Sequence, residues 1–221
     1  VVQVIEKYDL VAVPVVDSIG RLVGRITVDD VMDEVREQAE RDYQLASGLS
    51  QDVETHDNVF RQTTARLPWL LIGMIGGIGN SMILGNFDST FAAHPEMALY
   101  IPLIGGTGGN VGTQSSAIVV QGLANSSLDA ENTLKQVLKE STVALINATI
   151  ISMLVYIYNF VRFGATATVT YSVSISLFAV VMFASIFGTL VPMTLEKLKI
   201  DPAIATGPFI SITNDIIGMM I

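Results

Sequence analysis

The most restrictive feature of the sequence is a series of long segments without a charged residue. Four segments cover residues 67–87, 97–128, 141–161 and 163–195, and a fifth, 202–221, contains only Asp215. A bilayer core about 30 Å thick requires roughly 20 helical residues. We therefore expect a mostly α-helical, polytopic membrane protein with five transmembrane helices, at about 67–87, 98–124, 140–162, 171–195 and 202–221.

The charged residues are concentrated near the N-terminus. The first 66 residues contain 13 of the 21 acidic residues and 7 of the 12 basic ones. If the N-terminus is cytoplasmic, only Arg162 among the 12 basic residues lies outside, as the positive-inside rule requires. Five spans would then place the C-terminus outside. Because the chain opens within what reads as a folded domain, we expect it to be part of a longer protein.

The first 30 residues have the pattern of a small α/β unit. Residues 12–16 and 22–27 read as two short strands around a turn, followed by a helix that Thr27 and Asp30 cap. The strings PVVD, GRLVG and IT-DD resemble the second half of a CBS domain. We expect residues 1–30 to be the C-terminal part of a CBS domain, 31–57 an acidic linking helix and linker, and 58–221 the transmembrane domain.

The helix after the strands is strongly acidic, with Arg36 and Arg41 as its only basic residues. Its acids are Asp29, Asp30, Asp33, Glu34, Glu37, Glu40 and Asp42. One interpretation is a solvated face, on which like charges four residues apart cost about 0.2–0.5 kcal/mol per pair. The other is a surface that divalent cations bridge to further acids. Mg²⁺ suits this role because it keeps several waters and needs only one or two carboxylates.

The second charge-free segment combines glycines with polar side chains. Its five glycines between positions 105 and 112 form the pairs Gly105/Gly109 and Gly108/Gly112, which could be helix-packing faces. Packing does not explain six hydroxyl and amide side chains at bilayer depth. Such groups are tolerated only where protein buries them or water reaches them, so we favour a pore or cavity lining. The six are Thr107, Asn110, Thr113, Gln114, Ser115 and Ser116.

Asp215 is the only charged residue deep within a predicted span. Exposing it to lipid would cost roughly 2.5–3.5 kcal/mol, and no basic residue of the spans can pair with it. A cation or a proton must therefore balance it. A two-fold axis would bring two such carboxylates together, which balances a hydrated Mg²⁺ ion. Ser211, Thr213 and the backbone near Gly207 and Pro208 could hold the water shell.

Other residues favour structural roles. The charge-free segments contain no nucleophile–base arrangement, phosphate loop or zinc motif, so we expect neither an enzyme nor a nucleic-acid partner. His56 and His94 read as solvated side chains. We expect Asn147 to form a helix–helix hydrogen bond, and Glu140 to reach the cytoplasmic surface beside Lys139.

Three motifs resemble those of a known family. The strings IPLIGGTGGNVGTQSS, LKE and KIDPAIATGPFISITND, in this order after the CBS-like segment, resemble the MgtE family of magnesium channels. The resemblance implies a homodimer with five spans per subunit and a pore formed by spans two and five. It also implies that the acidic helix acts as a Mg²⁺-sensitive plug.

Matched motif by motif, the resemblance assigns roles to individual residues. Asp215 corresponds to the pore aspartate that binds hydrated Mg²⁺, and Asp201 lies at the inner mouth. Two departures are Gly207, where some members have Asn, and Arg41, which interrupts the acidic run. The expected acids of the sensing region are Asp30, Asp33 and Asp42, with Asp29, Glu34, Glu37 and Glu40 as further regulatory acids. The expected pore lining is Gly207, Pro208, Ser211, Thr213, Gly108, Gly109 and Asn110.

The leading functional prediction is a passive Mg²⁺ channel of the cell membrane, with Mg²⁺ as both the transported ion and the regulatory ligand. One alternative is a secondary carrier that couples the flux of a divalent cation to a proton or Na⁺ gradient. Another is a membrane-anchored CBS-type ligand sensor without transport, which would leave the polar second span unexplained.

Overall fold

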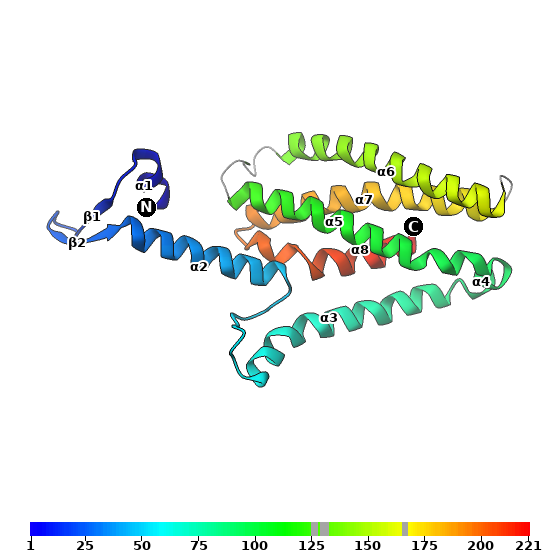
Figure 1. Ribbon diagram of the computed structural model, residues 1–221, viewed down its shortest axis with the longest axis horizontal. Helices are drawn as coiled ribbons and strands as arrows, with labels where there is room; N and C mark the ends of the chain where they lie inside the picture. The colour runs from blue at the N-terminus through cyan, green and yellow to red at the C-terminus, as the bar shows by residue number, and fades with distance from the viewer. Residues whose placement is uncertain (125–127, 129–132, 165–167) are drawn as a thin grey trace. The chain divides into compact units, whose positions relative to one another are not determined.

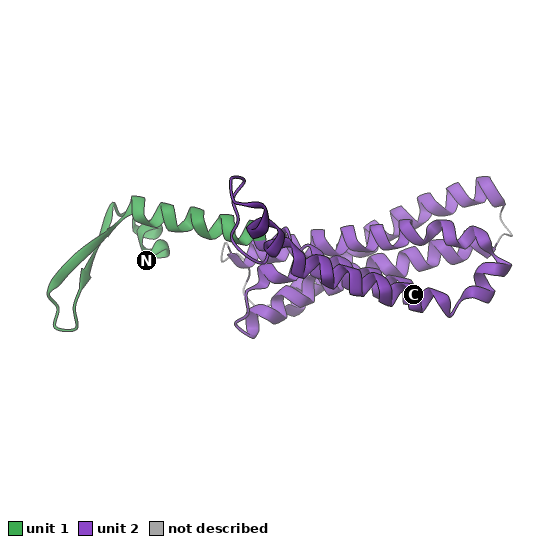
Figure 2. Cartoon of the chain, turned by 90° about the horizontal axis from the view of Figure 1, so that it is seen from below, with its two compact units in different colours: residues 1–44 green, residues 45–221 purple. Residues whose placement is uncertain are grey.

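The computed structural model describes residues 1–124, 128, 133–164 and 168–221. The chain divides into two units, Val1–Gln44 and Leu45–Ile221 (Figures 1 and 2). Each unit has its own architecture.

The first unit is built around a β-hairpin. A short helix α1 (Val2–Tyr8) precedes strands β1 (Ala12–Val16) and β2 (Leu22–Thr27), which pair antiparallel with Ala12 opposite Thr27. The Asp17 carboxylate closes the turn by accepting hydrogen bonds from the backbone N–H groups of Ile19 and Arg21, at 3.0 and 2.8 Å. Both predicted strands are confirmed.

Helix α2 (Val28–Ala46) follows β2 directly, and its first turn has the predicted cap. The Thr27 backbone N–H and hydroxyl both donate to Asp30 Oδ2, at 2.8 and 2.6 Å, while the Asp30 N–H donates back to Thr27 Oγ1 at 3.4 Å. These reciprocal bonds satisfy N–H groups that lack a partner at the start of a helix.

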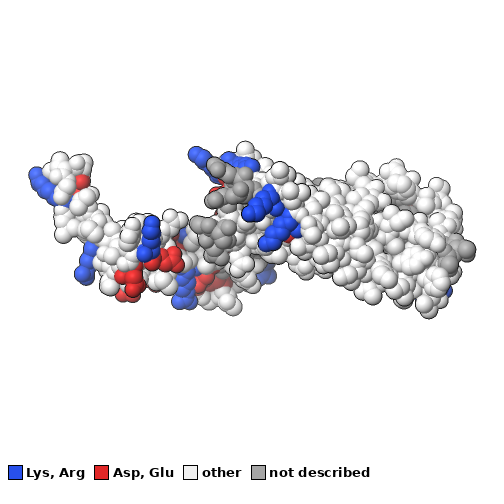
Figure 3. All heavy atoms as spheres, turned by 90° about the horizontal axis from the view of Figure 1, so that it is seen from above, with Lys and Arg blue, Asp and Glu red and all other residues white. Residues whose placement is uncertain are grey.

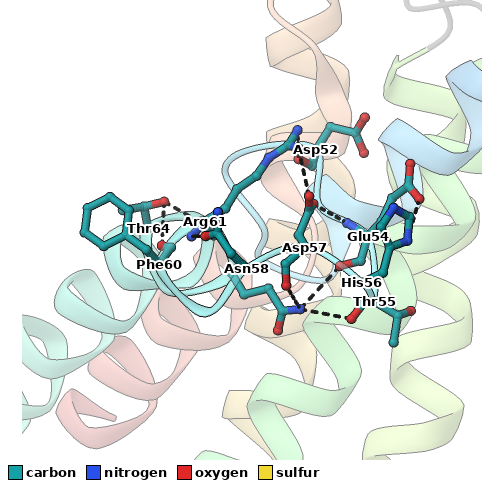
Figure 4. Close-up of polar contacts among 10 residues, drawn as sticks. Asp52, Glu54, Thr55, His56, Asp57, Asn58, Phe60, Arg61 and Thr64 are labelled. Atoms are coloured by element: carbon teal, nitrogen blue, oxygen red, sulfur yellow. Dashed lines mark hydrogen bonds and ion pairs between the residues drawn. The ribbon is translucent and has the colours of Figure 1, made fainter.

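The polar linker before α3 (Val59–Gly85) is fixed by its own hydrogen bonds (Figure 4). Arg61 donates to Asp57 Oδ1 at 2.9 Å and to the carbonyl oxygen of Asp52 at 3.1 Å. The Asn58 side chain caps α3 by accepting from the Arg61 N–H at 2.8 Å. The chain therefore enters α3 through an ordered, charge-paired turn.

The second unit is a helical bundle with α7 at its centre. Helix α7 packs against α5 and α6, α8 packs mainly on α5, and α3 packs mainly on α8. Glycines allow the α3–α8 approach, since a Cβ atom at Gly76 would lie 2.5 Å from Ile212 Cγ2. The further elements are α4 (Asp88–Ala93), η1 (Pro95–Tyr100), α5 (Ile101–Ala124), α6 (Thr133–Phe163), α7 (Thr168–Lys197), η3 (Pro202–Ala205) and α8 (Pro208–Met220).

Three of the described helices, α3, α6 and α7, are long and apolar enough to cross a membrane. Of these, α7 is the most buried and α3 the most exposed. On the face seen in Figure 3, most of the helical bundle carries no charged side chain. These features identify a membrane protein whose outer helices present apolar surface.

The predicted fifth span is not one continuous helix, which corrects the expectation for residues 202–221. Helix η3 ends at Ala205, and α8 begins only at Pro208, after Gly207 adopts φ 54° and ψ −121°. The 13 residues of α8 measure about 20 Å at 1.5 Å per residue, against a bilayer core of about 30 Å. The Gly-Pro dipeptide is the sequence signal of this break.

Candidate functional site

Asp215 projects from α8 toward two glycines of α5. A Cβ atom at Gly105 would lie 3.4 Å from Asp215 Oδ1, and one at Gly109 would lie 3.7 Å from the same oxygen. The side chain is partly buried, and no basic group of the described residues lies within ion-pair distance of it. The carboxylate thus lies where α8 packs against two residues of α5 that have no side chain.

Ser211 lies one turn before Asp215 on the same face of α8. A Cβ atom at Gly109 would be 2.9 Å from Ser211 Oγ, which is closer than ordinary contact. The predicted residues Asp215, Ser211 and Gly109 are therefore brought together. The carboxylate oxygens of Asp215 and the hydroxyl oxygen of Ser211 are of the kind that a hydrated, hard cation prefers.

The residue before Asp215 on α8 is tightly packed between helices. Asn214 is 1% exposed, and neither atom of its amide group has a hydrogen-bond partner among the described residues. Its amide lies directly over Gly112, where a Cβ atom would also be 2.7 Å from Ile210 Cγ2. Gly188 of α7 closes against the Gly112 carbonyl oxygen, so three helices meet at this level.

Three other residues of the expected pore lining do not lie beside Asp215. Gly108 packs toward α7, since a Cβ atom there would be 2.8 Å from Val180 Cγ1. The Asn110 side chain is exposed. The Thr213 hydroxyl donates to the Phe209 carbonyl oxygen of its own helix at 2.8 Å. Because Thr213 precedes Asp215 by two residues on α8, the two side chains lie on different faces of the helix.

Gly207 and Pro208 form the start of α8, and Asp201 lies just before η3. The left-handed φ of Gly207 is accessible to glycine, and a Cβ atom there would also collide with the Ala46 carbonyl oxygen. Asp201 caps η3 by accepting from the Ala203 N–H at 2.9 Å. The Asp201 carboxylate is exposed. The break before α8 separates Asp201 in sequence from Asp215.

The acids of α2 are largely paired along the helix. Arg41 donates to Glu37 and Glu34 at 2.6 and 3.2 Å, and Arg36 donates to Glu40 at 3.1 Å. Arg41, which interrupts the acidic run, thus offsets much of the expected repulsion.

The remaining α2 acids differ in their surroundings. Gln38 donates to Asp42 at 2.7 Å, whereas Asp29 and Asp33 are exposed and have no hydrogen bond or ion pair with a described residue. The side-chain and backbone hydrogen bonds from Thr27 lower the pKa of Asp30. Among the described residues, no group of three or more acids and histidines is arranged to hold a metal ion.

Sequence reasoning missed a buried carboxylate at the junction of α5, α6 and α7. Glu140 is 8% exposed and does not reach the surface as predicted. Its Oε1 accepts hydrogen bonds from the Ser115 and Ser185 hydroxyls, both at 2.7 Å. The adjacent Lys139 suggested that Glu140 would lie beside it at the surface. Instead, serine hydroxyls from α5 and α7 provide the polar surroundings of the Glu140 carboxylate.

A second missed contact involves an amide of α6. Tyr100 donates to Asn159 Oδ1, and Asn159 is fully buried. The expectation for Asn147 is wrong within this chain, because its side chain is exposed and has no hydrogen bond to a described residue. Hydropathy identifies a helix but does not identify which of its faces is buried.

The family model for MgtE, described as a divalent cation transporter, matches residues 101–221, which is more than half of the chain. The chain belongs to the MgtE family. The matched region contains α5, α6, α7 and α8. It therefore includes Asp215, Ser211 and the two glycines that they face, Gly105 and Gly109.

Curated MgtE-family relatives match the whole chain. The magnesium transporter MgtE of Bacillus subtilis (strain 168) is 33% identical over 221 residues, and that of Enterococcus faecalis is 32% identical over 221 residues. The magnesium transporter MgtE of Thermus thermophilus is 33% identical over 227 residues. These matches cover all of this chain but only 48–49% of each relative. The chain thus spans about half the length of these MgtE relatives.

Proposed function

We propose that this chain forms the membrane domain of a passive Mg²⁺ channel that works as a homodimer. The observation that carries the proposal is the partly buried Asp215, which faces Gly105 and Gly109 and has no basic partner among the described residues. Membership of the MgtE family supports Mg²⁺ as the transported ion.

The dimer follows from charge balance. One carboxylate per chain cannot neutralise a divalent ion, but a two-fold axis supplies Asp215 from both copies. Two carboxylates balance Mg²⁺ without removing its waters, and Ser211 together with Gly109 backbone would contact the hydration shell. Inward movement of two charges through 100 mV releases about 4.6 kcal/mol, so no further energy source is needed.

The proposed topology has five spans, formed by α3, α5, α6, α7 and the segment of η3 with α8. The break at Gly207 fits this topology, since irregular backbone is tolerated at bilayer depth where protein buries it or water reaches it. The N-terminus would be cytoplasmic and the C-terminus outside the cell membrane. Asp201, Gly207 and Pro208 would then line the inner entrance.

Regulation is proposed for the segment before the bundle. Residues 1–30 would be the end of a CBS domain and 31–57 the acidic linking helix and linker, with Mg²⁺ bound near Asp30, Asp33 and Asp42. Asp29 and Asp33 are the best placed for a bridging ion, because they have no partner among the described residues. Glu34, Glu37 and Glu40 would contribute less while they pair with arginine.

The decisive experiment measures Mg²⁺ uptake in a bacterial strain that lacks its own importers. Asp215→Asn keeps the size of the side chain but removes its charge, so we expect uptake to fall to the background of the strain. Asp88→Asn, a change at an exposed acid of α4, is the matched control and should transport normally. Normal uptake by Asp215→Asn would contradict the proposed pore.

A second measurement separates the channel from a coupled carrier. Purified protein in liposomes should pass Mg²⁺ at constant voltage regardless of any proton or Na⁺ gradient. Flux that stops when such a gradient is collapsed would favour the carrier.

A further inference from the structure

A hollow lies between the linker, α3 and the start of α8, all within the second unit. Its volume is about 540 Å³, and its apolar lining includes Leu49, Leu70, Pro208 and Ile212. Arg66 and Trp69 of α3 also line it. The hollow therefore combines an apolar surface with one cation and one indole ring.

Glycines allow α3 and the linker to approach α8 closely beside the hollow. A Cβ atom at Gly76 would lie 2.5 Å from Ile212 Cγ2, and one at Gly48 would lie 2.6 Å from Pro208 Cγ. Gly73 leaves more room, with 3.7 Å from its Cβ position to Ile212 Cδ1. Gly48 and Gly73 are themselves lining residues of the hollow.

Arg66 is a free cation at the edge of the apolar part of α3. It is exposed, and it forms no hydrogen bond or ion pair with a described residue, whereas Arg61 on the same helix pairs with Asp57 and the Asp52 carbonyl. It is the last charged residue before the charge-free segment 67–87. Helix α3 is long and apolar enough to cross a membrane, and a basic residue at the end of its apolar part is expected at the level of the lipid headgroups.

Trp69 lies about one turn after Arg66 on α3 and lines the same hollow. Tryptophan is enriched where the polar and apolar layers of a bilayer meet. A guanidinium group binds phosphate through two parallel hydrogen bonds, and basic pockets between membrane helices bind anionic headgroups. Below this level, Leu70 and Ile212 offer the apolar surface that an acyl chain requires.

We propose that this hollow is a binding site for an anionic phospholipid. The lipid phosphate pairs with the Arg66 guanidinium, the glycerol region lies beside Trp69, and an acyl chain follows Leu70 and Ile212. The lipid also contacts Pro208, the first residue of the helix that carries Asp215. This site takes a lipid whether or not the chain conducts Mg²⁺.

The test uses Trp69 as a built-in reporter, because it is the only tryptophan of the chain. The protein is reconstituted in phosphatidylcholine vesicles in which an equal minor fraction of lipid is brominated phosphatidylglycerol or brominated phosphatidylcholine. Bromine quenches nearby indole fluorescence. We expect the quenching data to correspond to roughly fivefold stronger binding of the anionic lipid, the contribution of about one basic residue at an anionic surface.

Four variants make this result specific. Arg66→Gln should abolish the preference and Arg66→Lys should keep part of it, while Lys139→Gln, at an exposed base of α6, should leave it intact. Gly73→Leu keeps every charge but fills the hollow, so it should also abolish the preference. If Arg66→Gln fails to fold, Arg66→Lys and Gly73→Leu still decide the question.

Several results would overturn the proposal. Equal quenching by the two brominated lipids would exclude selective binding, and an unchanged preference in Gly73→Leu or Arg66→Gln would place the lipid elsewhere. Equal losses in Arg66→Gln and Lys139→Gln would indicate general attraction to a charged membrane. Loss of the preference on addition of inorganic phosphate would identify a phosphate site rather than a lipid site.

Discussion

At the scale of single residues, two glycines of α5 have different surroundings. Gly112 lies under the Asn214 amide, and a Cβ atom there would be 2.7 Å from Ile210 Cγ2, whereas no atom of a described residue lies within 4 Å of the Cβ position at Gly106. Gly112→Ala should therefore lower stability by about 1–3 kcal/mol through overpacking. Gly106→Ala, the matched control, should leave stability unchanged or raise it by up to about 1 kcal/mol. Thermal unfolding in detergent measures both changes, and equal behaviour would contradict the close contact of α5 and α8.

A second residue-scale prediction concerns Glu140. Glu140→Ala removes the acceptor shared by the buried Ser115 and Ser185 hydroxyls, and an unsatisfied buried group costs about 1–3 kcal/mol. Glu140→Gln keeps an acceptor oxygen and should lose less. Glu196→Ala, at an exposed acid of α7, is the control, and the unfolding midpoint is the measurement. A midpoint for Glu140→Ala equal to that of the control would contradict the buried network.

The sequence was informative about residues whose partners are local. The Thr27–Asp30 cap is confirmed, because both residues belong to one helical turn. Glu140 was misassigned, because its burial depends on serines 25 and 45 residues away. The proximity of Asp215 to Gly105 and Gly109 likewise depends on the packing of α8 on α5, which no spacing in the sequence specifies.

At the scale of elements, the cap at the start of α2 depends on the ionisation of Asp30. The pKa of Asp30 is lowered, first by the Thr27 side chain and then by the Thr27 backbone. A lowered acid pKa means that the cap stabilises α2 above the ordinary value of 3.8 and is lost as the pH falls through the lowered value. Thr27→Val should raise the pKa of Asp30, and Thr63→Val in α3 should not change it. Carboxyl ¹³C NMR titration checks both, and an unchanged pKa in Thr27→Val would contradict the cap.

The sequence predicted the helices and strands best where the composition changes sharply along the chain. The hairpin strands match the prediction residue for residue, and the apolar segments at α3, α6 and α7 are confirmed as helices able to cross a membrane. The last segment was predicted as one span because its hydropathy is continuous. Backbone geometry at Gly207 interrupts it, and hydropathy does not measure backbone geometry.

At the scale of the whole molecule, the proposed topology can be tested because the chain contains no cysteine. Single cysteines at the exposed positions Gln51, Ser89 and Glu196 report on three connecting regions. In intact cells, a membrane-impermeant maleimide should label Ser89→Cys only, while all three should react after permeabilisation. Labelling of Glu196→Cys in intact cells would contradict the five-span arrangement.

The shared acceptor at Glu140 also constrains how this family can change over time. One carboxylate oxygen serves hydroxyls from two other helices, so positions 115, 140 and 185 are not free to mutate independently. A lineage that replaces the acid with an apolar residue gains from replacing both serines with alanine in the same interval. Loss of one serine first leaves Glu140 with the other donor, whereas loss of the acid first leaves a buried hydroxyl hydrogen without an acceptor, so sequence drift at this junction should begin at position 115 or 185.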